Sequence, residues 1–130
     1  MDAAVFDADG DGDIDILIAI EFRENIILIN DGEGKFTDES DERLPRNSRD
    51  SEDIGIADLD NDGDSDVIIV SEDDRINEFY LNDGNGYFTD VSERIIVQGT
   101  SNAVAVADIN DDGSPDIFIG LGRNFRLNGF

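Results

Sequence analysis

Short apolar runs alternate with acidic, glycine-containing loops along the whole chain. The longest runs are rich in Ile, Leu and Val, and each follows an acidic loop, at residues 14–20, 66–70 and 116–121. Such nearly continuous apolar stretches are typical of strands that are buried on both faces. Sustained helical periodicity is missing, although single helical turns are expected near residues 38–44 and 90–95. The pattern predicts an all-β protein.

Further strands are predicted on both sides of these runs. An opening strand enters each acidic loop, at residues 3–6, 54–57 and 104–107. A third strand follows each long run, at residues 26–29, 78–81 and 125–127. The third strands end in Asn-Asp-Gly or Asn-Gly sequences, which are strong signals for a hairpin turn. Phe36 and Phe88 then open a fourth strand, and we expect them, with Phe130, to pack in the core between repeats.

The strands and loops form an internal repeat. Three Asp-rich segments align without gaps at residues 7–15, 58–66 and 108–116, so their starts are 51 and 50 residues apart. A second motif follows each of them, at residues 29–38, 81–90 and, in shortened form, 127–130. A four-stranded unit of about 50 residues is typical of a β-propeller blade. The chain therefore reads as a single repeat domain with two full blades, 1–52 and 53–102, and a truncated third, 103–130.

The charge balance restricts the partners and the chemistry. The chain carries 33 acidic and 9 basic residues, a net charge of −24, which excludes nucleic acid as a default partner. It contains no cysteine and no histidine, so thiol chemistry and the usual general base are missing and no enzyme activity is predicted. No apolar run approaches ~18 residues, so membrane insertion is not expected. Because repulsion of this size opposes compaction, bound divalent cations are the simplest way to neutralise it.

The acidic loops have the spacing of a calcium site. Calcium takes ~6–8 oxygen ligands, and each loop offers side-chain oxygens at positions one, three, five and nine, with a carbonyl available at position seven. Position six is Gly12, Gly63 or Gly113, where a sharp turn needs positive φ. An EF-hand is rejected, because its Glu at position twelve is replaced by Ile18, Ile69 and Ile119. We predict three Ca²⁺ ions per chain, held by Asp7, Asp9, Asp11, Asp13 and Asp15; by Asp58, Asp60, Asp62, Asp64 and Asp66; and by Asp108, Asn110, Asp112, Ser114 and Asp116.

The combination of D-x-[DN]-x-D-G-x-x-D with a following L-x-N-x-G-x-F turn resembles the FG-GAP/VCBS repeats. These occur in integrin α-chain propellers and in many bacterial surface proteins, and the resemblance covers essentially the whole chain. It implies blades of four antiparallel strands, with calcium held in the loop between the first two. Family members usually close rings of about seven blades, so we expect this chain to complete its ring by self-association.

Most of the basic residues are predicted at the blade edge opposite the acidic loops. In an up-and-down meander, that edge holds the loops between second and third strands and the connections between blades. Seven of the nine basic residues fall in these segments: Arg23, Arg43, Arg46, Arg49, Arg75, Arg94 and Arg123. Arg23, Arg75 and Arg123 recur at matching places, either as a ring facing a carboxylate or sugar ligand or, as we favour, as partners of neighbouring acids.

The sequence thus predicts a calcium-binding propeller repeat protein that acts in recognition, adhesion or assembly, with structural Ca²⁺ and no catalysis. Alternatives are a carbohydrate-binding, lectin-like propeller, a non-catalytic scaffold fragment of a larger polysaccharide-active enzyme, and an engineered self-assembling repeat protein. A homo-oligomer is expected, with a protein or carbohydrate ligand, at an extracellular or cell-surface location. The residues name neither the ligand nor the number of blades in the ring.

Overall fold

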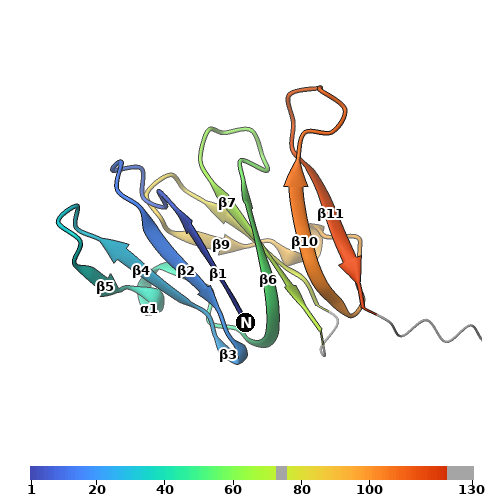
Figure 1. The fold of residues 1–130 in the computed structure, drawn as a ribbon, viewed down its shortest axis with the longest axis horizontal. Coiled ribbons are helices and arrows are strands. Elements are labelled where there is room, and N and C mark those ends of the chain that lie inside the picture. Colours follow the sequence, from blue (N-terminus) through green and yellow to red (C-terminus); the bar gives the residue numbers. More distant parts are fainter. Residues whose placement is uncertain (73–75, 123–130) are drawn as a thin grey trace, which may run out of the picture.

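The chain folds into three consecutive antiparallel sheets that stand side by side, seen in Figure 1 as a row from residue 1 to residue 122. The computed structural model describes residues 1–72 and 76–122. Its helices within this part are one short α-helix, α1 (Ser40–Arg43), and one 3-10 turn, η1 (Ser92–Arg94). They lie where single helical turns were predicted, and within the described residues no helix is long and apolar enough to cross a membrane. The prediction of an all-β protein is confirmed.

The first blade is the predicted four-stranded meander. Its strand order is β1-β2-β4-β5, and every pairing is antiparallel. The strands are β1 (Asp2–Phe6), β2 (Asp15–Ala19), β4 (Ile26–Asn30) and β5 (Phe36–Asp38). Since each acidic loop joins a first strand to a second, and each Asn-Asp-Gly turn joins a third to a fourth, both lie at the same edge of the blade.

The second blade repeats this order, and the described part of the third blade repeats its first two strands. The second is β6 (Ser48–Ala57), β7 (Asp66–Ser71), β8 (Glu78–Asn82) and β9 (Phe88–Asp90). Of the third, the described residues hold β10 (Ser101–Ala107) and β11 (Asp116–Leu121). The predicted third strand at 125–127, with Arg123 and Phe130, lies outside the described residues, as does Arg75.

The segment after β2 is a strand, where the sequence predicted a loop. β3 (Glu21–Glu24) pairs with β6 of the next blade, so it extends the second sheet beyond its first strand. To match it, β6 begins at Ser48 instead of residue 54. This pairing could not be predicted from the sequence, because both segments are mostly polar and neither shows the alternation of apolar and polar residues that marks a strand. A bulge between Glu21 and Arg23 places Phe22 at a φ of 58°, a left-handed conformation that is unusual for an aromatic residue.

Adjacent blades pack through the innermost strands β1, β6 and β10. Gly55 of β6 is the contact point for the third blade, because a Cβ at this position would lie 2.8 Å from Val106 Cγ2 and 3.4 Å from Val104 Cγ2. Alternate residues of β6 face the other way, and Ile54 is buried in the core that includes Phe6 and Leu17 of the first blade. The glycine thus gives two sheets room to approach closely.

The Asn-Asp-Gly turn of the second blade packs against the first blade at one edge of their interface. Asn82 Nδ2 donates to Ala8 O at 2.8 Å, and the ring of Phe88 meets Phe6 edge-on at a centroid distance of 6.4 Å. Phe88 is 7% exposed, whereas its counterpart Phe36 is 41% exposed because no sheet within the described part of the chain covers that side of the first blade. The prediction that these phenylalanines lie between blades is therefore confirmed for Phe88 but not for Phe36.

A buried carboxylate lies in the same interface. Glu78 is fully buried, at the position that Ile26 occupies in the first blade, and it accepts hydrogen bonds from Tyr80 OH and from Arg49 Nε at 3.3 Å. Asn25 Nδ2 of the first blade lies 3.5 Å from its Oε2, so the group bridges the two blades. Burial raises the pKa of Glu78, while the Tyr80 hydrogen bond and the charge of Arg49 oppose that rise.

This network predicts a specific pH dependence. A carboxyl whose pKa is raised on folding stabilises the fold most below its ordinary pKa of 4.5, and that contribution is lost as pH rises through the folded pKa. The unfolding free energy of the parent, measured relative to Glu78→Gln, should therefore fall as pH rises above about 4.5. Urea unfolding of both proteins at a series of pH values checks this. The subtraction cancels the acids that do not interact with Glu78, and a difference that rises with pH would contradict the expectation.

Candidate functional site

Each acidic loop is a tight curl that is held by its own carboxylates. In the first loop, Asp7 accepts from Gly10 N at 2.8 Å and from Gly12 N at 3.0 Å. Gly12 has a φ of 94°, which confirms that position six requires a left-handed residue. The second and third loops repeat the arrangement, since Asp58 and Asp108 accept from Gly63 N and Gly113 N, both at 2.9 Å. The aligned sequences therefore have the same local structure.

Carboxylates converge in the first two loops. Oxygens of Asp7, Asp9 and Asp15 lie within 4.8 Å of one another, as do oxygens of Asp58, Asp60 and Asp62. Burial, followed by the charges of Asp11 and Asp15, raises the pKa of Asp9. Desolvation and the charge of Asp62 likewise raise the pKa of Asp60. A hard cation between such oxygens would relieve this repulsion, so the acidic clusters can hold metal ions.

The third loop offers less charge than the other two. Asn110 replaces the third-position aspartate, and its Nδ2 donates to Asp112 Oδ2 at 2.9 Å. Ser114 Oγ, at position seven, lies 3.4 Å from Asn61 Nδ2 of the second loop, so this side chain faces the neighbouring blade. The candidate set is thus Asp108, Asn110, Asp112 and Asp116, with one carboxylate fewer than in the first loop.

The ninth-position aspartate has a second role that the sequence did not reveal. Asp15 is fully buried, and its two oxygens accept from Ala8 N and from Asn30 N, both at 2.8 Å. Asp66 is buried in the same way and accepts from Leu59 N at 2.8 Å and Asn82 N at 2.9 Å. Burial raises the pKa of Asp66, and these two hydrogen bonds oppose the rise. The residue therefore ties the acidic loop to the hairpin turn of its own blade.

The seventh-position aspartates lie beside the hairpin turn. A Cβ on Gly32 would clash with Asp13 Oδ2, and a Cβ on Gly84 would clash with Asp64 Oδ2. Asp13 and Asp64, predicted as metal ligands, thus have carboxylates against the turn of their own blade, and their role as ligands stays a prediction.

Arg43 lies on the acidic-loop side, which corrects its predicted place at the opposite edge. Its guanidinium donates to Asn85 O of the second blade's turn, lies 4.0 Å from Asp9 Oδ2, and stacks 4.7 Å from the centroid of the Tyr87 ring. The Glu39 carboxylate is 2.6 Å from its Nε. The sequence placed the α1 segment correctly, but the long side chain crosses to the other edge.

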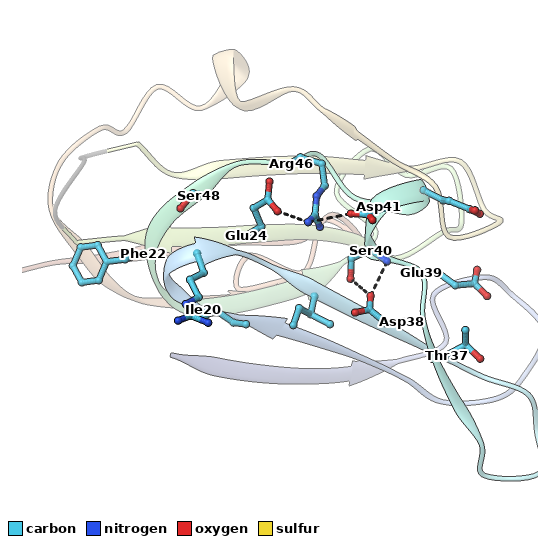
Figure 2. Close-up of a pocket in the computed structure, with 13 residues that line it drawn as sticks. Ile20, Phe22, Glu24, Thr37, Asp38, Glu39, Ser40, Asp41, Arg46 and Ser48 are labelled. Atoms are coloured by element: carbon cyan, nitrogen blue, oxygen red, sulfur yellow. Dashed lines mark hydrogen bonds and ion pairs between the residues drawn. The ribbon is translucent and has the colours of Figure 1, made fainter.

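The opposite edge of the first blade contains a cavity of ≈ 1010 Å³ (Figure 2). It lies between the β3 segment and the connection from β5 to β6, and its wall includes Phe22, Arg23 and Arg46. Arg46 pairs with Glu24 and with Asp41 at 3.1 Å, as Figure 2 shows. Arg23 is therefore beside a cavity, as the ligand hypothesis requires. The matching Arg75 and Arg123 lie outside the described residues, so the arginine ring stays a prediction.

One acidic cluster was missed by sequence analysis. Oxygens of Asp50, Glu52 and Glu72 lie within 4.8 Å of one another at the far edge of the second blade. Strand pairing brings them together, with Glu72 N donating to Asp50 O at 3.1 Å. They belong to no spaced motif, so only the register of β6 on β7 reveals them.

Comparison with protein families agrees with this geometry. The family model for the FG-GAP-like repeat matches residues 7–69 and again 58–119. The chain therefore belongs to the FG-GAP-like repeat family, and its sheets are blades of a propeller repeat module. A search of curated proteins gave no significant match.

The different roles within one loop can be separated by mutation. Asp15→Ala leaves the buried Ala8 and Asn30 N–H groups without an acceptor, so it should lower the unfolding free energy by about 2–5 kcal/mol with or without calcium. Asp11→Ala removes an exposed acceptor, so without calcium it should cost below ~1 kcal/mol. Urea denaturation in calcium and in EDTA measures both. Equal losses for the two variants in EDTA would show that Asp15 has no structural role of its own.

Proposed function

We propose that this protein is a calcium-binding propeller repeat module for recognition, in which Ca²⁺ is structural and no reaction is catalysed. Three loops of one design lie at one edge of three blades. The observation that carries the proposal is the convergence of carboxylate oxygens within 4.8 Å in the first two loops. Oxygen-only sites of this kind suit calcium better than magnesium, which keeps its waters and demands a strict octahedron.

The proposal includes three ions per chain, with ligands from positions one, three, five and nine and the carbonyl of position seven. The third site binds most weakly, because Asn110 lowers the ligand charge. Extracellular calcium modules bind with Kd values of ~10⁻⁴–10⁻³ M. We place the protein at an extracellular or cell-surface location, where calcium at ~1 mM would occupy sites of this range.

Calcium removal tests this function. A site with Kd ~10⁻⁴ M in ~1 mM calcium adds roughly 1.4 kcal/mol by mass action, and three such sites add about 4 kcal/mol. Chelation with EDTA should therefore lower the melting temperature by roughly 10 °C or more. Magnesium at the same concentration is the control and should restore little of the loss. A melting curve that complete chelation leaves unchanged would rule out structural calcium.

The cavity favours carbohydrate recognition as a second candidate function. Phe22 is 64% exposed at the cavity wall, and its left-handed backbone costs of order 1–3 kcal/mol, a strain that is often found at functional sites. Arg46 is fixed between Glu24 and Asp41, so donors and acceptors stand side by side. Such an array suits the vicinal hydroxyls of a neutral sugar, and an aromatic ring suits its apolar face.

An array of neutral oligosaccharides, followed by titration of any sugar that binds, tests the second candidate. Phe22→Ala should weaken binding about 2- to 10-fold, the effect of losing one ring contact. Phe118→Ala is the matched control, because Phe118 is also an exposed aromatic but lies on β11, away from the cavity. Absence of binding, or an equal effect of both variants, would reject carbohydrate recognition at the cavity.

A further inference from the structure

The innermost strands have a small residue on one face and a branched residue on the other. In β1, β6 and β10, the small residues that face the following blade are Ala4, Gly55 and Ala105. The branched residues that face the preceding blade are Val5, Ile56 and Val106. The contact of Val106 on Gly55 shows how they fit: the branched side chain of one blade sits on the small residue of the blade before it.

A backbone-to-aspartate hydrogen bond accompanies this contact in both interfaces between blades. Ile54 N of the second blade donates to Asp2 Oδ2 at 3.3 Å, and Val104 N of the third donates to Asp53 Oδ2 at 2.8 Å. In the first interface, the turn of the second blade adds the bond from Asn82 to Ala8 O. An interface between blades thus has a receiving half and an inserting half, and both are described in atomic detail within this chain.

The first and third blades stand at the two ends of the row of sheets (Figure 1), and among residues 1–72 and 76–122 each leaves one half of this interface unpaired. The first blade exposes an inserting half, in which Val5 is 66% exposed and Phe36 and the turn at 31–35 are open to solvent. The third blade exposes a receiving half, in which Ala105 and Ala107 are exposed and Ile109, the counterpart of Ala8, is 63% exposed. The counterparts of Val5, Phe36, Ala105, Ala107 and Ile109 are buried or half-buried where two blades of the chain meet.

We propose that the first blade of a second copy of this chain docks on the third blade, head to tail. Val5 of the second copy then sits on Ala105 as Val106 sits on Gly55, and the Asn30 amide reaches Ile109 O as Asn82 reaches Ala8 O. The occupant is a second copy because the two exposed surfaces are the two halves of one interface that the chain already forms. A contact of this kind is heterologous, so its repetition builds a closed ring when the rotation per chain permits.

One position makes this contact weaker than its counterparts inside the chain. Ala103 occupies the place of Asp2 and Asp53, so the receiving half lacks the carboxylate that accepts the N–H of the incoming strand. Ala103→Asp should restore this acceptor for Ala3 N of the second copy. One added hydrogen bond corresponds to an association about 2- to 10-fold tighter.

Disulfide trapping tests the orientation directly, since the chain contains no cysteine. Val5→Cys and Ala105→Cys proteins are mixed under mild oxidation in calcium, and linked chains are identified by giving one variant a mass tag. Head-to-tail docking predicts a Val5–Ala105 crosslink in excess of either self-linked product. Asn61→Cys with Ser114→Cys in one chain is the positive control, because these two side chains already lie 3.4 Å apart across the second and third blades.

Sedimentation of the parent chain completes the experiment. A species larger than 14.3 kDa in calcium, weakened by Val5→Asp and strengthened by Ala103→Asp, is expected. Val5→Asp alters a side chain that is mostly exposed in the isolated chain, so the melting temperature of the dilute protein should change little. A monomer at about 100 μM, or crosslinks in which like variants pair as often as unlike ones while the positive control closes, would overturn the proposal. Neither readout depends on whether the cavity binds a sugar.

Discussion

The buried aspartate at the end of each acidic loop is the interaction on which blade and site both depend. In the first two blades, Asp15 and Asp66 are fully buried, and each carboxylate accepts one N–H from the loop and one from the hairpin turn. Both donors are needed, because a buried carboxylate oxygen that loses its hydrogen-bond donor costs free energy. The loop therefore cannot unfold without losing its hydrogen-bonded link to the hairpin turn. The sheet in this way holds the acidic loop in place.

This bond also couples the loops to the packing between blades. The backbone of Ala8, at position two of the first loop, donates to Asp15 with its N–H and accepts from Asn82 of the next blade with its carbonyl. Arg43 adds a second link between the two blades, because its guanidinium lies near Asp9 of the first loop and donates to Asn85 O of the second blade's turn. An ion that orders the first loop would consequently order the surface on which the second blade rests. Metal affinity and blade packing are then linked free energies, as they are whenever a ligand binds only the folded form.

Local patterns in the sequence predicted most of the fold, while contacts made by register or by long side chains were missed. The runs at 14–20 and 66–70 predicted β2 and β7, because strands that are buried on both faces have nearly continuous apolar sequences. β3 could not be found in this way, since its partner in β6 is distant and both are polar. Spacing likewise identified the acidic loops, but it predicted the same role, metal ligand, for Asp13 and Asp15. Only the fold shows one beside the turn glycine and the other buried beneath the loop.

Identical motifs in this chain differ in burial because a propeller blade acquires much of its core from its neighbours. Phe36 and Phe88 end the same turn sequence, yet of the two only Phe88 has a sheet against it among residues 1–72 and 76–122. Nearest-neighbour contacts of this kind make the stability of a repeat array a sum over interfaces as well as units. The described residues contain two such interfaces among three blades, and the middle blade takes part in both, which accounts for β7 being buried at every residue. Opening should therefore begin at the outer blades, and whatever covers their exposed faces will control how readily the array unfolds.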